Sequence, residues 1–193
     1  GTLVEATGGN TGIGVALVGN ALGYKSIIVM PDTQAQEKKD TVRACGAELR
    51  EVPAVPYKDP NNYVHVAQRL AEEVGGYFCN QFDNTANRDG HIQTTGPEIW
   101  DALDGKIDAF TTAVGTGGTL AGISIALKER SKNILTVAAD PGGSVVHDFI
   151  KTGELTTEGG SITEGIGQGR VTLNLKDAPL DDAERVLDPE ALD

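Results

Sequence analysis

Apolar and polar residues follow one another along the chain in an order that predicts strands alternating with helices. Short apolar runs bounded by glycine, proline or polar residues are typical of buried strands. The expected strands are Leu3–Ala6, Ile27–Met30, Ala47–Val52, Tyr77–Asn80, Ala109–Val114 and Ile134–Ala139. Helical patterns between them predict helices over Ile13–Leu22, Gln34–Cys45, Tyr63–Val74, His91–Leu103 and Leu120–Lys128. The pattern indicates an α/β protein.

Such alternation favours right-handed βαβ units and two lobes built around parallel sheets. The polar, turn-rich segment Phe82–Arg88 is the expected boundary, with residues 1–86 in a smaller lobe and residues 87–193 in part of a larger one. The chain begins at Gly1, and the acidic stretch ending at Asp193 is expected to be structureless. We therefore expect a fold that is incomplete at both ends.

Two glycine-rich turns, each between an expected strand and an expected helix, are the candidate binding features. The first runs from Thr7 to Gly14 and the second from Gly115 to Thr119. Such turns leave backbone N–H groups unpaired at a helix N-terminus, where the helix dipole also favours negative charge. Glycine matters there because a Cβ would obstruct the bent backbone and the approach of a ligand. Because ligands of parallel sheets bind beyond the carboxyl ends of the strands, the turns predict two anionic groups held side by side, such as a phosphate and a carboxylate.

The net charge limits which partners the chain is expected to bind, and the cysteines indicate its cellular compartment. The chain has 193 residues and a net charge of −12 with histidine counted as neutral. A protein with so little basic character is not expected to bind nucleic acid or an anionic membrane. No apolar run approaches the roughly 20 residues that span a bilayer. Cys45 and Cys79 are widely spaced, as expected for buried thiols in the reducing cytoplasm.

Three other kinds of site fit the residues less well. The first turn also matches the nicotinamide-binding turn of short-chain dehydrogenases, but no tyrosine has the required lysine four residues later. The histidines His65, His91 and His147 lack neighbours at metal-ligand spacing, so we expect no metal site. We interpret His91 as a helix residue that makes a structural hydrogen bond. A serine hydrolase is not expected because G-x-S-x-G is absent from the sequence.

Read with their neighbours, the two turns belong to a series of motifs. The series comprises Thr7-Gly8-Gly9-Asn10-Thr11-Gly12, Asn80-Gln81-Phe82-Asp83-Asn84, His91 with Thr94-Thr95-Gly96-Pro97-Glu98-Ile99-Trp100, Gly115-Thr116-Gly117-Gly118-Thr119, and Glu164-Gly165-Ile166-Gly167. From about Leu3 to Val171 the chain thereby resembles the cysteine synthases, or O-acetylserine sulfhydrylases. The resemblance implies a pyridoxal 5′-phosphate enzyme of the tryptophan-synthase-like fold, with two lobes of three-layer αβα architecture around parallel sheets.

The resemblance implies a role for each turn. The cofactor phosphate would be held by Gly115, Thr116, Gly117, Gly118 and Thr119, and the 3′-oxygen of the pyridine ring would be hydrogen-bonded by Asn10. A phosphate dianion suits backbone amides, a threonine hydroxyl and a helix N-terminus. The carboxylate of the amino-acid substrate would be gripped by Thr7, the Gly8 and Gly9 amides, Thr11 and Gln81, with Gly165 lining the cleft beside the ring. The alternative to a carboxylate-binding role for Gln81 is that its side chain caps a loop.

The chain departs from the family pattern in two ways. In the family, a lysine upstream of the first turn forms an imine with the cofactor and acts as acid and base at Cα. No lysine of this chain matches that motif, so we expect the lysine upstream of Gly1 and assign no catalytic residue here. Lys25 lies at the start of an expected strand, at the end opposite the predicted site. Lys106, Lys128 and Lys132 are expected to be solvated charges. Gly8 stands where the family usually carries serine, and a hydroxyl directed at the carboxylate is lost.

The resemblance also implies a reaction and partners. The reaction is replacement of the acetate of O-acetylserine by sulfide to give cysteine. Three alternatives stay open: a cystathionine β-synthase-like enzyme with homocysteine as second substrate, a serine/threonine dehydratase, and a non-catalytic remnant that binds an anion or a partner. The implied partners are a second subunit in a homodimer and the C-terminal tail of serine acetyltransferase. Because an incomplete core exposes apolar surface, we expect the isolated chain to self-associate.

Overall fold

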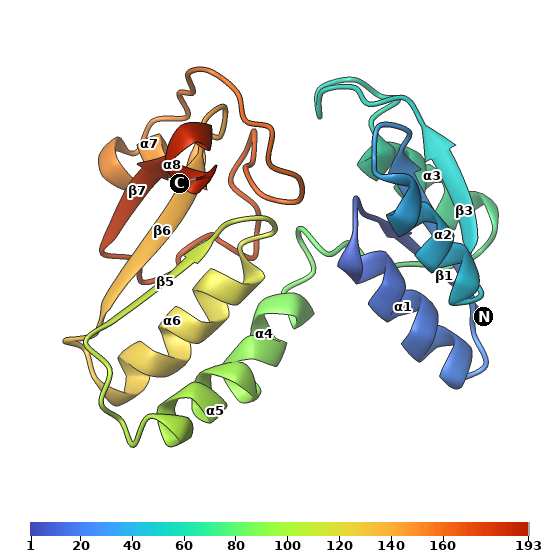
Figure 1. Cartoon of the computed structure of the whole chain (residues 1–193). Helices are drawn as coiled ribbons and strands as arrows, with labels where there is room; N and C mark the ends of the chain where they lie inside the picture. Colours follow the sequence, from blue (N-terminus) through green and yellow to red (C-terminus); the bar gives the residue numbers. More distant parts are fainter. Residues whose placement is uncertain (193) are drawn as a thin grey trace. The chain divides into compact units, whose positions relative to one another are not determined.

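The computed structural model describes residues 1–192 and divides into two compact units (Figure 1). The first unit is Gly1–Gln81, and the second begins at Phe82. This division lies five residues before the expected boundary after residue 86. The segment from Phe82 belongs with the second unit because the Phe82 carbonyl accepts a hydrogen bond from the Asn174 side chain at 2.8 Å.

The first unit is a four-stranded parallel sheet with helices on both faces. Its strands are β1 (Thr2–Ala6), β2 (Lys25–Pro31), β3 (Glu48–Val52) and β4 (Tyr77–Phe78), and its helices are α1 (Asn10–Ala21), α2 (Gln36–Ala44) and α3 (Tyr63–Glu73). The strand order is β3-β2-β1-β4, with every pair parallel. The chain moves outward from β1 to β3 and then returns to the far side of β1. Right-handed crossovers therefore place α1 and α2 on one face and α3 on the other (Figure 1).

Residues of β2 and the small residues of α1 form the core of this unit. Ile28 and Met30 of β2 pack with Ala16 of α1 in one buried cluster. Helix α1 lies close to the sheet because glycine faces it: a Cβ at Gly12 would lie 3.0 Å from the Ile28 Cγ2, and Gly19 is similarly confined. The start of α1, which carries the first glycine turn, is thereby held against the ends of β1 and β2.

The second unit is a three-stranded parallel sheet of order β5-β6-β7. Its strands are β5 (Ala109–Ala113), β6 (Leu135–Pro141) and β7 (Asp182–Val186), and its helices are α4 (Ala86–Gln93), α5 (Thr95–Ala102), α6 (Gly118–Arg130), α7 (Val146–Thr152) and α8 (Asp188–Leu192). Helix α6 contacts β5 and is also covered by α4 and α5, which is why it is apolar around most of its circumference. The two parallel sheets confirm the α/β fold predicted from the sequence.

Two expected elements differ in the structure. The helix predicted over His91–Leu103 begins earlier and is divided at Thr94, where the backbone has φ −123° and ψ −73°. Pro97 accounts for the break, because its ring would clash with the carbonyl four residues before it in a continuous helix. The acidic C-terminal stretch was expected to be structureless, and this was wrong: it forms β7, which pairs with β6 and buries Ala183, and then α8.

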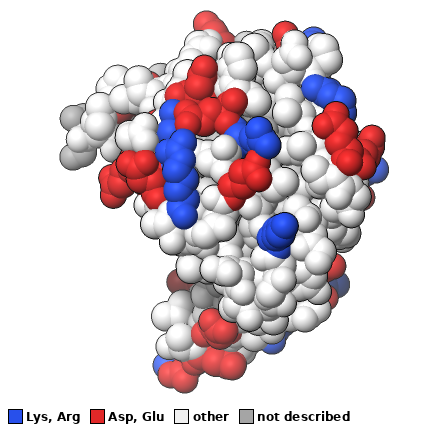
Figure 2. All heavy atoms as spheres, turned by 90° about the vertical axis from the view of Figure 1, so that its right-hand side faces the viewer, with Lys and Arg blue, Asp and Glu red and all other residues white. Residues whose placement is uncertain are grey.

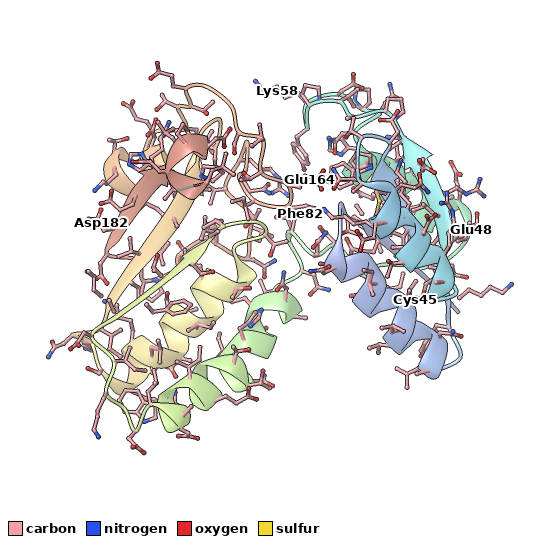
Figure 3. All side chains as sticks on the ribbon, in the orientation of Figure 1. Cys45, Glu48, Lys58, Phe82, Glu164 and Asp182 are labelled. Atoms are coloured by element: carbon pink, nitrogen blue, oxygen red, sulfur yellow. The ribbon has the colours of Figure 1, made fainter. Side chains whose placement is uncertain are left out.

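Charged side chains of both signs are interspersed on the face shown in Figure 2, and no single basic patch dominates it. In the first unit, Arg43 bonds both Asp40 and Glu51, and Arg50 pairs with Glu48. Glu48 lies on β3, and Cys45 lies at the end of α2 (Figure 3). None of the helices within residues 1–192 is long and apolar enough to cross a membrane.

Helix α1 presents apolar side chains to solvent, and this supports the expected self-association. Leu17, Val18 and Leu22 are 54–68% exposed and share one side of the helix. We expect the isolated chain to form oligomers at micromolar concentration, and we expect Val18→Glu to weaken that association about tenfold by placing a charge in the apolar surface. Sedimentation velocity measures both. Ile162→Glu, on an exposed loop of the second unit, is the matched control; a monodisperse wild-type monomer would contradict the prediction.

Candidate functional site

The first glycine turn lies at the point of the first sheet where the direction of strand addition reverses. It follows β1, which is flanked by β2 on one side and β4 on the other, and ligands of open α/β sheets bind at such points. The Thr7 hydroxyl accepts a hydrogen bond from the Gly9 N–H at 3.0 Å. The N–H groups of Gly8 and Asn10 donate to no other residue within 1–192. The turn therefore presents backbone donors at the N-terminus of α1.

Gln81, just beyond β4, is fastened to this turn. Its Oε1 accepts a hydrogen bond from the Thr11 hydroxyl at 2.6 Å, and its Nε2 donates to the Ala6 carbonyl at 2.7 Å. The Ala6 carbonyl fixes which way the amide faces, because only the NH₂ group can donate to it. The structure thus brings together the predicted carboxylate-binding residues of the first unit. It also shows that the hydroxyl proton of Thr11 is directed at Gln81.

Glu5 is a buried carboxyl beneath the turn that the sequence analysis did not single out. It lies in β1 with no exposed surface and accepts hydrogen bonds from the Ala6 N–H at 2.7 Å and the Gln81 N–H at 3.2 Å. Burial raises its pKa to about 7 against the lowering effect of these two bonds. Burial and then the charge of Glu5 raise the pKa of the neighbouring Cys79 thiol to about 11, which excludes Cys79 as a thiolate nucleophile at neutral pH. The signal in the sequence was an acidic residue inside an apolar strand.

The second glycine turn joins β5 to α6. Gly117 is the N-cap residue of α6 and has a left-handed backbone with φ +83°. The N–H groups of Thr116 and Gly117 donate to no other residue within the described part of the chain, whereas the Gly118 N–H donates to the Thr116 hydroxyl at 3.3 Å. The first turn of any helix also leaves N–H groups without intrahelical partners. These donors form a cradle suited to an oxyanion.

The backbone of this turn leaves no space for side chains at its glycines. A Cβ at Gly115 would lie 2.6 Å from the Gly165 carbonyl oxygen, and a Cβ at Gly117 would lie 2.7 Å from the Leu175 Cβ. Gly165 itself has φ +84°. The structure therefore brings Gly165 against the predicted phosphate turn, through its carbonyl oxygen.

Helix α4 supports the second turn from the side opposite the sheet. The Asn87 amide donates to the Thr116 hydroxyl at 2.9 Å. His91 lies between two threonines, with Nδ1 2.9 Å from the Thr95 hydroxyl and Nε2 3.2 Å from the Thr119 hydroxyl, which confirms its structural hydrogen bond. Burial lowers the pKa of His91, so the ring is neutral at neutral pH. Asn87 was not anticipated, because only the packing of α4 on α6 brings it to the turn.

Asp83 and Arg170 anchor the segment that follows Gln81 within the second unit. Phe82 opens this segment (Figure 3). The Arg170 guanidinium donates to both Asp83 carboxylate oxygens, at 2.9 and 2.7 Å, and the Leu173 N–H adds a third bond at 2.9 Å. Burial acts to raise the pKa of Asp83, but these bonds and the charge of Arg170 outweigh it and lower the pKa. A bidentate pair of this kind holds the glycine-rich segment after Gly165 in register with the segment before α4.

Lys39, Lys128 and Lys151 each pair with a carboxylate. Lys25 begins β2, at the end opposite the first turn. Lys39 is buried and bonds the Asp32 carbonyl and Glu51. The expectation that Lys128 is a solvated charge was wrong, since its side chain is 16% exposed and pairs with Asp181 at 2.5 Å. Residues 1–192 contain no cluster of histidine, cysteine and acidic residues able to hold a metal ion.

Comparisons with known proteins agree with these features. The family model described as pyridoxal-phosphate dependent enzyme matches residues 1–193. The chain is 56% identical over 180 residues to cysteine synthase 1 of Emericella nidulans, covering 91% of this chain and 49% of that protein. It is 53% identical over 195 residues to cysteine synthase 1 of Neurospora crassa, covering 98% of this chain and 52% of that protein. It also resembles the crystal structure of an O-ureido-L-serine synthase, with a TM-score of 0.85 at 32% identity over 97% of this chain and 57% of that one. The chain spans about half the length of the curated relatives it matches.

Proposed function

The chain belongs to the family of pyridoxal-phosphate dependent enzymes, and from that premise we propose that it carries the cofactor-phosphate and substrate-carboxylate turns of a cysteine synthase. The proposed reaction replaces the acetate of O-acetylserine with sulfide. The observation that carries the proposal is the second glycine turn, in which the Thr116 and Gly117 N–H groups donate to no residue within 1–192 and the glycines leave no room for side chains. Sulfide is the proposed second substrate because both fungal relatives are named cysteine synthase.

In this proposal the second unit holds the cofactor through its phosphate. The turn Gly115–Thr119 supplies backbone N–H groups and two hydroxyls, and Asn87 and His91 hold those hydroxyls in place. A neutral His91 suits this position, because it orients Thr119 without adding charge of its own. Gly165, Leu175 and Asn87 occupy the places where Cβ atoms at Gly115, Gly117 and Gly118 would lie, so only glycine allows the backbone that directs the N–H groups of this turn toward an oxyanion.

The first unit holds the amino acid through its carboxylate. Gly8 and Asn10 offer backbone N–H groups at the N-terminus of α1, where the helix dipole favours an anion. The exposed Asn10 side chain is assigned to the ring 3′-oxygen, which an uncharged amide can bond without shifting the charge of the ring. Gln81 braces Thr11 against the end of β1 through its two hydrogen bonds.

When bound, pyridoxal phosphate supplies the electron sink that stabilises a carbanion at the substrate Cα. The residues of this chain bind and orient the two anionic groups. Proton transfer at Cα is assigned to a lysine outside these residues, because Lys39, Lys128 and Lys151 are each committed to an ion pair and no lysine of the chain matches the family motif. We therefore propose no catalytic acid or base within the chain.

Binding of pyridoxal phosphate, followed by borohydride reduction and peptide mass mapping, tests the proposal. We expect the purified chain to bind pyridoxal phosphate at least about tenfold more tightly than pyridoxal, because only the former carries the phosphate. We expect no reduced lysine adduct and no cysteine formed from O-acetylserine and sulfide by the chain alone. Equal affinity for pyridoxal would refute the phosphate assignment, and one specifically modified lysine would refute the assignment of the lysine.

The remaining partners are proposed on the family resemblance. A homodimer and the C-terminal tail of serine acetyltransferase are the proposed protein partners. A cytoplasmic location is proposed because both thiols, Cys45 and Cys79, are free. If the chain binds phosphate but no amino acid, the alternative of a non-catalytic anion-binding module is favoured instead.

A further inference from the structure

Gln34 lies where the connection after β2 meets the first glycine turn. Strands β1 and β2 are parallel neighbours, with Ala6 paired to Val29, so the segments that follow them emerge at the same edge of the sheet. After β2 the chain turns, with the Gln34 N–H bonded to the Pro31 carbonyl at 3.2 Å. The half-buried Gln34 side chain is thereby directed onto Gly8.

The amide of Gln34 occupies the space that a side chain at position 8 would take. A Cβ added at Gly8 would lie 2.9 Å from the Gln34 Oε1 and 3.1 Å from its Cδ. Contacts under 3.0 Å at a Cβ require one of the two side chains to move. The chain therefore accommodates either a side chain at position 8 or the Gln34 amide in this place.

Two donors of the first turn are already engaged and leave few for a carboxylate. The Gly9 N–H donates to the Thr7 hydroxyl oxygen, and the Thr11 hydroxyl donates to Gln81, so Thr7 is the hydroxyl of this turn that keeps its proton for a ligand. The serine hydroxyl typical of cysteine synthases is missing at Gly8. A buried or half-buried carboxylate needs several donors to replace its water, and each missing one is costly.

We propose that the Gln34 amide supplies the missing donor and binds the carboxylate of the amino-acid substrate. This inference rests on the proposed function of the first turn. The Gln34 amide makes no hydrogen bond to another residue within 1–192, in contrast to the engaged amide of Gln81. Rotation about its Cγ–Cδ bond presents NH₂ or oxygen with almost the same shape, so the donor can face the turn without displacing Gly8.

The test measures the affinity of five forms of the full chain for L-serine in the presence of pyridoxal phosphate, by NMR titration. Ethanolamine, which lacks the carboxylate, is the control ligand. Gln34→Ala is expected to weaken L-serine binding about tenfold, the ratio that corresponds to one hydrogen bond to a charged group. Gly8→Ser alone is expected to keep L-serine affinity close to that of the wild type, because its Cβ displaces the flexible end of Gln34 and the serine hydroxyl takes the place of the amide as donor. The double variant is expected to bind better than Gln34→Ala alone, since the serine hydroxyl replaces the missing amide.

Gln36→Ala is the matched control, because this nearby exposed glutamine bonds Asp40 rather than the turn. It is expected to leave L-serine affinity unchanged, and all variants are expected to keep the wild-type affinity for pyridoxal phosphate. Gln34→Ala with wild-type affinity for L-serine, or a double variant weaker than Gln34→Ala, would overturn the assignment of Gln34 alone. A wild-type chain that binds no L-serine would overturn the proposed function of the first turn and this inference together.

Discussion

Replacing Gly117 with alanine is expected to lower the free energy of unfolding of the second unit by about 3 kcal/mol and to weaken pyridoxal phosphate binding at least about a hundredfold. Two costs add at this position. Gly117 has φ +83°, and a left-handed backbone costs other residues roughly 1–2 kcal/mol. The new Cβ would also lie 2.7 Å from the Cβ of Leu175, which is buried in the core, and overpacking costs roughly 1–3 kcal/mol.

The loss of affinity follows because relief of the strain must move the N–H groups that form the phosphate cradle. Urea unfolding followed by the fluorescence of Trp100 measures stability, since this single tryptophan lies in the second unit. Gly169→Ala is the control: it is in the same unit, has no positive φ, and has open space around its Cβ. If Gly117→Ala kept wild-type affinity for pyridoxal phosphate, the phosphate would have to be held elsewhere.

The stability of the first unit is expected to fall as pH rises from 4 to 8, by about 3 kcal/mol from Glu5 alone. Burial raises the pKa of Glu5 from 4.5 to about 7 in the folded chain. The folded state therefore keeps its proton at pH values where the unfolded state has lost it. The stabilisation is complete below about pH 4.5 and is lost as pH rises through about 7.

Glu5→Gln isolates this contribution, because glutamine has a similar shape and cannot ionise. Urea unfolding followed by circular dichroism at several pH values gives the difference in free energy of unfolding between the two forms. We expect that difference to change by about 3 kcal/mol between pH 4 and pH 8, with the wild type losing stability relative to the variant. Burial lowers the pKa of His91, which acts in the opposite direction, but that effect is common to both forms and cancels. Parallel curves for the two forms would contradict the prediction, because they would show that Glu5 has the same pKa in the folded and unfolded chain.

Much of the fold was predictable because its signals are local. Apolar runs such as Ile27–Met30 indicate buried strands. Gly23 and Gly46, both with positive φ, follow the ends of the helices before them. The exceptions were decided by distant contacts. Strand β7 has an acidic sequence without a continuous apolar run, and it forms a strand because it pairs with β6. The break at Thr94 was signalled by Pro97, but the early start of α4 depends on its close packing against α6.

The glycine turns were also predictable, because anion binding at a helix N-terminus needs only neighbouring residues in a defined order. The residues that support the turns were not. Thr11 and Gln81 are 70 positions apart, and Asp83 and Arg170 are 87 apart, yet each pair is hydrogen-bonded. Cysteine-synthase-like motifs indicated Gln81 by resemblance, whereas nothing in the sequence indicated Gln34 or Asn87.

By itself, the sequence determined the alternation of strands and helices, the two glycine turns and the likeness to cysteine synthases, because each depends on residues that are close along the chain. Only the tertiary structure decided which donors of the first turn are already engaged, which amide covers Gly8, and which carboxyl is buried beneath Gln81. The physical reason is that parallel strands bring the ends of separate segments to one edge of a sheet. Side chains that are unrelated in the sequence then compete there for the same hydrogen bonds and the same space.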